Sequence, residues 1–141
     1  MNAEANLNIL LENLAPTLAE GEYVICSLDI GEYERLPERA LGTFFETEGI
    51  TVIVLREQAD RLKLPYTLIA RMITLQVYSS LDAVGLLAAV SAALAAHGIP
   101  ANTVSAYYHD HLFVPVDRAR AALQVLQELE QRASESARAG R

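Results

Sequence analysis

Small and polar side chains gather just ahead of an apolar stretch whose spacing predicts a helix. Gly85 falls in what reads as the first turn of that helix, where four backbone N–H groups have no partner inside the helix and no side chain shields them. These N–H groups and the positive end of the helix dipole suit a carboxylate. The side chains of Ser79, Ser80 and Asp82 would then orient an α-amino acid. The alternative interpretation is that Gly85 only allows close packing against a neighbouring strand.

A second polar group follows the next apolar segment and raises the question of a metal site. The imidazoles of His109 and His111 flank the carboxylate of Asp110, next to Tyr107. In an extended segment the two histidines point to one face and Asp110 to the other, and apart from His97 nothing nearby completes a four-ligand set. We therefore expect no metal and no other cofactor. Asp110 is expected either to stabilise a turn or to accept a ligand's ammonium group.

Residues for catalysis do not form any recognisable pattern. The chain has no nucleophile with an adjacent base, no acid–base pair, no phosphate-binding loop and no dinucleotide fingerprint, so we expect no enzyme, and an uncharacterised enzyme ranks last among the hypotheses. The single cysteine, Cys26, lies in an apolar run where burial as a small hydrophobe is expected. The acidic residues Asp29, Glu32, Glu34 and Glu38 could hold a cation but more often form a solvated connection.

The composition restricts the class of protein. The 141 residues suit one compact domain, or two very small subdomains that share a core, and 52% of them are apolar, so a packed interior is expected. A net charge of −7 would repel phosphate backbones, so we expect no nucleic acid partner. The densest apolar stretch, residues 81–96, is too short to span a bilayer, and the first eight residues lack the basic start of a signal peptide. We therefore expect a cytoplasmic protein without a membrane partner.

Apolar periodicity and breaker residues divide the first half into five elements. Leucines at helical spacing stop at Pro16, and β-branched runs flank Glu48-Gly49. The predicted elements are a helix over residues 7–14, a strand over 23–28, a polar loop with room for one helical turn over 31–41, a hairpin of residues 43–46 and 51–55, and a helix over 57–62.

The second half gives a clearer pattern of strand, long helix, hairpin and helix. Asp82 is expected to cap the long helix and Gly98 to end it, and Asp117 to cap the last helix. The predicted elements are a strand over residues 73–78, a helix from 82 to 98, strands over 103–108 and 111–116 joined by a turn at 109–110, and a final helix before a flexible tail over 134–141.

These elements make up most of a split βαβ, ferredoxin-like unit, and the first half repeats the order without its long helix. The fold class is therefore α+β with two ferredoxin-like halves, the first degenerate. We expect the degenerate half over residues 1–66, the complete half over 67–133 and the tail over 134–141. The second half lacks its fourth strand, which must come from the first half or from a second chain.

Residues 81–107, LDAVGLLAAVSAALAAHGIPANTVSAY, resemble the signature of the ACT domain (βαββαβ). In that signature an acidic residue and a glycine precede a leucine pair, as Asp82 and Gly85 do here, and a glycine-isoleucine pair closes the helix, as Gly98 and Ile99 do. Residues 106–123, AYYHDHLFVPVDRARAAL, are similar to the hairpin and last helix of small bacterial tandem ACT proteins, which are related to arginine sensors and to the regulatory part of aspartate kinases. The resemblance extends over about residues 7–130.

The resemblance implies an amino-acid-binding regulatory fold that commonly works as a dimer with sheets joined side by side and ligands held between ACT units. One departure is Val84, where many ACT domains carry proline. The leading hypothesis is a small-molecule-sensing regulatory module for an amino acid or similar small carboxylate, working as a homodimer. The alternative is a ligand-free dimerisation scaffold that acts through a partner protein. The predicted ligand-binding residues are Ser79, Ser80, Asp82, Ala83, Val84, Gly85, Leu86, Asn102, Tyr107, His109 and Asp110.

Overall fold

The computed structural model describes residues 3–140, and the chain forms two compact units. The inserted unit is residues 21–70, and the split unit joins residues 1–20 to residues 71–141. Each unit is described by itself. This division differs from the predicted halves over residues 1–66 and 67–133, because the first helix and first strand pack with the C-terminal part of the chain.

The inserted unit is an antiparallel sheet in the strand order β3-β4-β2-β5. Alternating burial along β2 places Val24, Cys26 and Leu28 in its core, since successive side chains of a strand point to opposite faces. This order is that of a ferredoxin-like unit whose fourth strand is the start of β5. Its elements are β2 (Tyr23–Leu28), α2 (Ile30–Glu34), β3 (Gly42–Phe45), β4 (Ile50–Leu55), α3 (Arg56–Arg61) and the beginning of β5 (Ile69–Leu75).

A single helical turn, α2, stands where a complete unit would have its long helix. The Asp29 carboxylate accepts from the Glu32 N–H at 2.8 Å and the Glu32 carboxylate accepts from the Asp29 N–H at 3.0 Å, which is a capping box. Glu38 forms an ion pair with Arg61 at 2.9 Å. These acidic residues therefore cap and pair within the unit, and the prediction of one helical turn in this loop is confirmed.

The split unit contains the clearer ferredoxin-like pattern, with sheet order β6-β7-β5-β1. Its fourth strand is β1, which pairs antiparallel with β5 from Pro16 opposite Leu75 to Leu18 opposite Ile73. The first half of the chain thus supplies the strand that the second half lacks. The elements are α1 (Leu7–Glu12), β1 (Pro16–Leu18), the end of β5, α4 (Leu86–Ala96), β6 (Asn102–Ser105), β7 (Asp110–Pro115), the 3-10 turn η1 (Val116–Arg118) and α5 (Ala119–Ala139).

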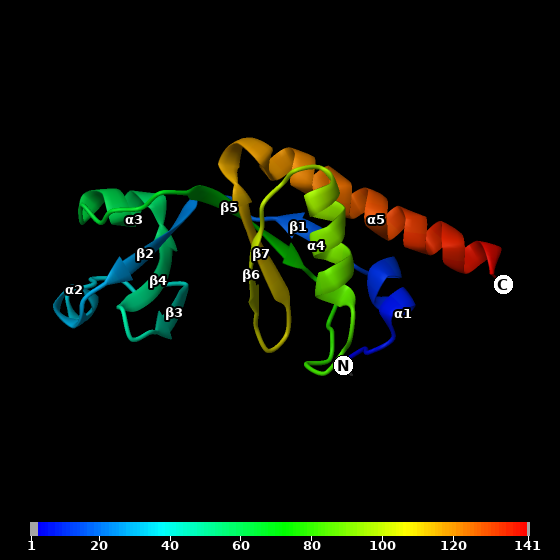
Figure 1. The fold of residues 1–141 in the computed structure, drawn as a ribbon, viewed down its shortest axis with the longest axis horizontal. Helices are drawn as coiled ribbons and strands as arrows, with labels where there is room; N and C mark the ends of the chain where they lie inside the picture. Colours follow the sequence, from blue (N-terminus) through cyan, green and yellow to red (C-terminus); the bar gives the residue numbers. More distant parts are fainter. Residues whose placement is uncertain (1–2, 141) are drawn as a thin grey trace. The chain divides into compact units, whose positions relative to one another are not determined.

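Helices α1, α4 and α5 pack with the strands of the split unit around one apolar core, and Figure 1 shows α4 and α5 beside β5 and β7. Fully burying one leucine-sized side chain contributes about 1.5–3 kcal/mol, so this cluster is the main source of stability for the unit. The core contains Leu10, Leu14, Ile73, Leu75, Leu86, Val90, Leu94, Ile99, Leu112, Val114, Ala119, Ala122, Val125 and Leu126.

Several predicted boundaries are wrong. Strand β5 covers Ile69–Leu75 rather than residues 73–78. The second hairpin turns over residues 106–109, with the Ala106 N–H donating to the His109 carbonyl at 3.0 Å, because the register sets Ser105 opposite Asp110 and so buries Asp110 on the same face as Leu112. Asp117 lies in η1 and makes no cap.

The predicted flexible tail is also wrong for residues 134–139, which continue helix α5 to Ala139. The segment holds alanine, glutamate and arginine, which favour a helix, and no glycine or proline before Gly140. The Gln131 amide donates to the Glu135 carboxylate one turn later at 3.3 Å.

Candidate functional site

The start of α4 presents backbone donors without partners. Gly85 is the N-cap residue with φ 101°, and the first helical hydrogen bond joins the Ala89 N–H to the Gly85 carbonyl at 3.0 Å. Among residues 3–140, no side chain caps this end. The N–H groups of Leu86, Leu87 and Ala88 therefore remain available to an acceptor. The helix begins at Leu86 and not at residue 82, so Gly85 precedes its first turn.

The backbone conformation at position 85, more than a ligand, accounts for the glycine there. Its φ lies in the left-handed region that side chains strain to adopt, and a Cβ placed there would lie 3.1 Å from Leu7 Cδ2. The predicted close packing against a strand is thus found against the first helix instead. A larger residue at this position would strain the loop and press on Leu7.

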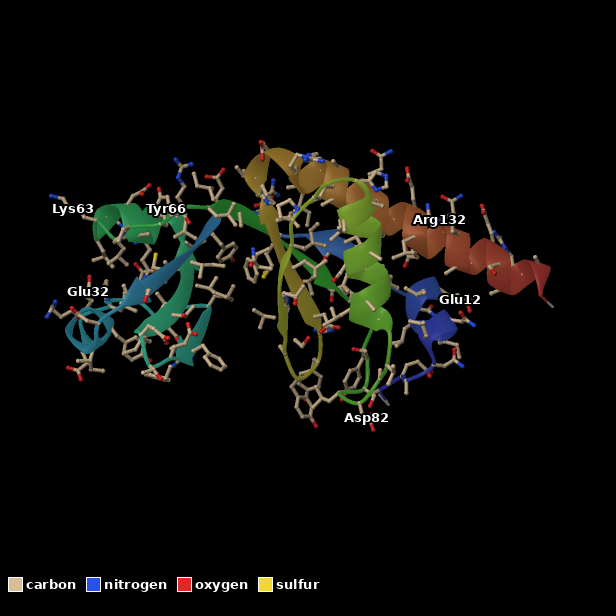
Figure 2. All side chains as sticks on the ribbon, in the orientation of Figure 1. Glu12, Glu32, Lys63, Tyr66, Asp82 and Arg132 are labelled. Carbon is tan, nitrogen blue, oxygen red and sulfur yellow. The ribbon has the colours of Figure 1, made fainter. Side chains whose placement is uncertain are left out.

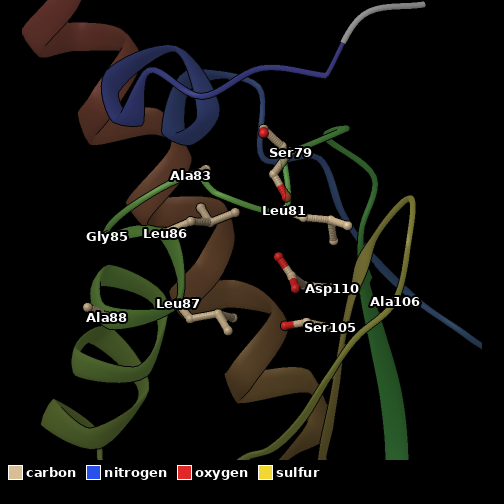
Figure 3. A pocket seen from close by; sticks show the side chains of 11 residues that line it. Ser79, Leu81, Ala83, Gly85, Leu86, Leu87, Ala88, Ser105, Ala106 and Asp110 are labelled. Carbon is tan, nitrogen blue, oxygen red and sulfur yellow. The ribbon is translucent and has the colours of Figure 1, made fainter.

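Asp110 is the one charged side chain of this site that is buried. It is the first residue of β7 and is 7% exposed. Between residues 3 and 140 no hydrogen bond or ion pair involves its carboxylate, and no fully buried polar atom is left without a partner, so the oxygens reach open space. Figure 3 shows this carboxylate directed into the space between the start of α4 and the segment that carries Ser79 and Leu81.

That space is a cavity of about 170 Å³, built wholly from the split unit. Pockets for drug-sized molecules are roughly 300–1,000 Å³, so this one suits a small ligand. In the part of the chain that the structure describes, no lysine or arginine lines it. Of the predicted residues, the cavity brings together Ser79, Ser80, Ala83, Gly85, Leu86 and Asp110, and it adds Leu81, Leu87, Ala88, Ser105 and Ala106, which sequence reasoning missed.

A second, more open hollow of about 490 Å³ shares Ser79, Ser80 and Leu81 with the cavity. It contains the predicted residues Asp82 and Tyr107. The Ser80 hydroxyl donates to the Asp82 carboxylate, so the predicted role of Asp82 as helix cap is wrong. Figure 2 shows Asp82 in the loop that leads to α4.

Three predicted residues lie outside both hollows. Val84 is 83% exposed and lines neither of them. Asn102 is at the far end of β6, opposite Phe113. His109 contacts the rings of Tyr108 and His111, with centroids 6.5 Å and 6.4 Å away.

His111 is on the opposite face of β7 from Asp110. Its Nδ1 lies 2.9 Å from the Thr74 hydroxyl. Burial lowers the pKa of His111 below its usual 6.5, and the charge of His109 lowers that pKa further, while Asp110 partly offsets both. The ring is therefore neutral at pH 7 and adds no positive charge beside the cavity.

The remaining chemistry of the chain is sparse. In the part of the chain that the structure describes, no three histidine, cysteine or acidic side chains gather closely enough to hold a metal ion. Cys26 is buried, and burial raises the pKa of its thiol, which disfavours the reactive thiolate. Residues 3–140 contain no helix of the length and apolarity needed to cross a membrane.

Comparison with known families finds ACT domains along most of the chain. One ACT-domain profile matches residues 2–71 and another matches residues 68–128. The matches meet inside β5, where the structure also divides. Comparison with curated protein sequences finds no significant match.

Solved structures support the same assignment. A protein of unknown function from Vibrio cholerae, described as a possible transport protein, is 40% identical, covers 88% of this chain and 95% of its own, and has a TM-score of 0.78. A protein from Agrobacterium tumefaciens is 19% identical, with coverages of 82% and 87% and a TM-score of 0.64. The ligand-free regulatory subunit of aspartate kinase from Thermus thermophilus is 11% identical, with coverages of 83% and 97% and a TM-score of 0.62. The last two show a shared fold alone. The profile matches and the Vibrio relative together show that this chain belongs to the ACT-domain family, with two ACT units in tandem.

Proposed function

We propose that this chain is a small-molecule-sensing regulatory module that binds an amino acid or similar small carboxylate at the start of α4. The observation that carries the proposal is Asp110, a buried carboxylate that has no hydrogen-bond or ion-pair partner among residues 3–140 and lies across a small cavity from helix N–H groups that are unpaired within the same range. Membership of the ACT family supports a ligand-sensing regulatory role in general terms. The expected cytoplasmic location stays a prediction.

The two ends of the cavity are complementary in charge to the two ends of an α-amino acid. The N–H groups of Leu86 to Ala88 and the positive end of the helix dipole favour the ligand carboxylate. The Asp110 carboxylate favours an ammonium group, because a charged hydrogen bond compensates the burial of both charges. A simple dicarboxylate would place negative charge against Asp110 and is therefore disfavoured.

The direct test is a thermal-shift screen of the twenty amino acids against the parent protein and the Asp110→Asn variant. A ligand at 100 times its dissociation constant should add about 2.7 kcal/mol to the free energy of unfolding of the parent. The variant should lose about 10- to 100-fold in affinity, since a hydrogen bond to a charged group contributes about 1.5–3 kcal/mol. Equal shifts for parent and variant would exclude Asp110 from the site.

The second candidate function, a ligand-free dimerisation scaffold, is favoured by exposed apolar groups on edge strand β3. Phe44 and Phe45 are 70% and 65% exposed, and edge strands with apolar side chains tend to pair with another chain. We propose a homodimer for both the sensing module and the ligand-free scaffold. A monomer by light scattering at micromolar concentration would argue against the dimer, and a protein that dimerises but ignores all amino acids would favour the scaffold.

A further inference from the structure

Residues 3–7, which we name the N-terminal strap, cross the loop that forms one wall of the cavity. The Glu4 N–H donates to the Tyr78 carbonyl at 2.9 Å, and the Ser80 N–H donates to the Glu4 carbonyl at 2.7 Å. Glu4 therefore forms a parallel bridge with Ser79. In Figure 3 the blue N-terminal segment passes beside Ser79.

The strap supplies the hydrogen bonds that fix this wall. Other bonds of residues 78–84 are internal to the segment, namely the Ala83 N–H to the Ser80 carbonyl at 3.0 Å and the contacts between Ser80 and Asp82. Between residues 3 and 140, the two bonds to Glu4 are thus the hydrogen bonds that tie this segment to a distant part of the chain. Ser79 and Ser80 line the cavity, so their position depends on the strap.

The same strap contacts the opposite wall at the start of α4. Leu7 Cδ2 lies within 3.1 Å of the position that a Cβ at Gly85 would take. Leu7 opens α1, which Asn6 caps by accepting the Ile9 N–H at 3.2 Å, and Leu10 of that helix is fully buried. The N-terminal strap therefore contacts both the segment with Ser79 and Ser80 and the start of α4, on the two sides of the proposed ligand position.

We propose that the N-terminal strap is a positioning element of the ligand site, which closes when the site is filled and opens more readily when it is empty. This inference rests on the proposed function. Ala3, Ala5 and Asn6 are exposed, and two backbone bonds hold the bridge, so its local opening costs much less than unfolding. A ligand that needs Ser79 and Ser80 in place binds the closed state alone, and its apparent dissociation constant rises as the closed fraction falls. Occupancy of the cavity is thereby transmitted to the N-terminal strap.

The test compares two variants at one position. Glu4→Pro removes both the side chain and the N–H that bonds to Tyr78, whereas Glu4→Ala removes the side chain and keeps both backbone bonds. Each is screened with the twenty amino acids singly, alongside the parent, and amide exchange at Ser80 is followed with and without each amino acid that binds. We expect Glu4→Pro to bind about tenfold more weakly, by loss of one hydrogen bond and of the closed state, and Glu4→Ala to bind within about twofold of the parent. Ser80 exchange should slow on binding in the parent and in Glu4→Ala.

The outcomes separate this inference from the function beneath it. If Glu4→Pro binds as tightly as Glu4→Ala, or if Ser80 exchange in the parent is the same with and without a bound amino acid, the strap does not position the site, while the proposed function stands. If the parent binds no amino acid, the proposed function fails and the strap inference fails with it. A merely structural strap would lower the unfolding midpoint of Glu4→Pro and leave both its affinity and the exchange response unchanged.

Discussion

Asp110→Asn removes one buried negative charge and keeps the shape of the side chain. Asp110 is 7% exposed, and its carboxylate has no hydrogen bond or ion pair among residues 3–140. A buried charged group without a partner costs about 1–3 kcal/mol or more, and access to the cavity puts this carboxylate near the low end, at about 1 kcal/mol. The ligand-free variant should therefore be more stable than the parent, which for 141 residues raises Tm by about 3–5 °C.

Calorimetry and urea unfolding at pH 7 without added amino acids measure this difference. Asp117→Asn is the matched control, since it makes the same charge change at an exposed site in η1 and should shift stability by less than about 0.5 kcal/mol. The control also accounts for the relief of repulsion in a chain of net charge −7. If Asp110→Asn lowers the stability of the empty protein by about 1 kcal/mol, the carboxylate already has a favourable partner there, and its assignment to a ligand's ammonium group is wrong.

Two further outcomes follow from the geometry. Gly85→Ala should lower the free energy of unfolding by about 2–3 kcal/mol, because it adds a contact with Leu7 to the strain of a left-handed backbone. Gly98 has φ 67° with open space around it, so Gly98→Ala should lower it by about 1 kcal/mol. Equal losses of stability in urea unfolding would show that the Leu7 contact does not matter. The pKa of His111 is lowered on folding from 6.5, so the unfolded chain binds more protons as the pH falls below that value and stability declines. His111→Gln should flatten this decline in unfolding curves taken between pH 7 and pH 5, and an unchanged slope would assign it to other groups.

The sequence predicts the elements of this fold better than their ends. Periodicity identifies β2 and the long helix correctly, because their apolar faces are buried in the cores of their units. The predicted start of α4 is wrong because an aspartate three residues before Gly85 fits the capping pattern equally well, and the left-handed backbone of Gly85, with Leu7 packed beside it, has no local signal in the sequence.

The sequence predicts that the split unit needs a fourth strand but does not predict where that strand lies. Strand β1 has three residues, begins with Pro16, and pairs with Leu75 and its neighbours, so no local pattern distinguishes it from the end of a helix. The same limit applies to the cavity. Ser105 and Ala106 reach it only through the register of β6 with β7, whereas the predicted lining residues from Ser79 to Leu86 lie close together in the sequence.

The division of one ACT unit into two chain segments also sets an order of events during synthesis. A ribosome makes residues 21–70 as a continuous segment that contains every strand of its own sheet up to the start of β5. Leu10, Leu14 and β1 emerge earlier but find their strand and helix partners only after residue 71 and beyond have been made. Because pairing across a long separation must first overcome the entropy of closing the loop, the later-finished unit folds more slowly. Leu10 and Leu14 therefore stay unburied while residues 21–70 are made, and their segment is where a chaperone would be needed.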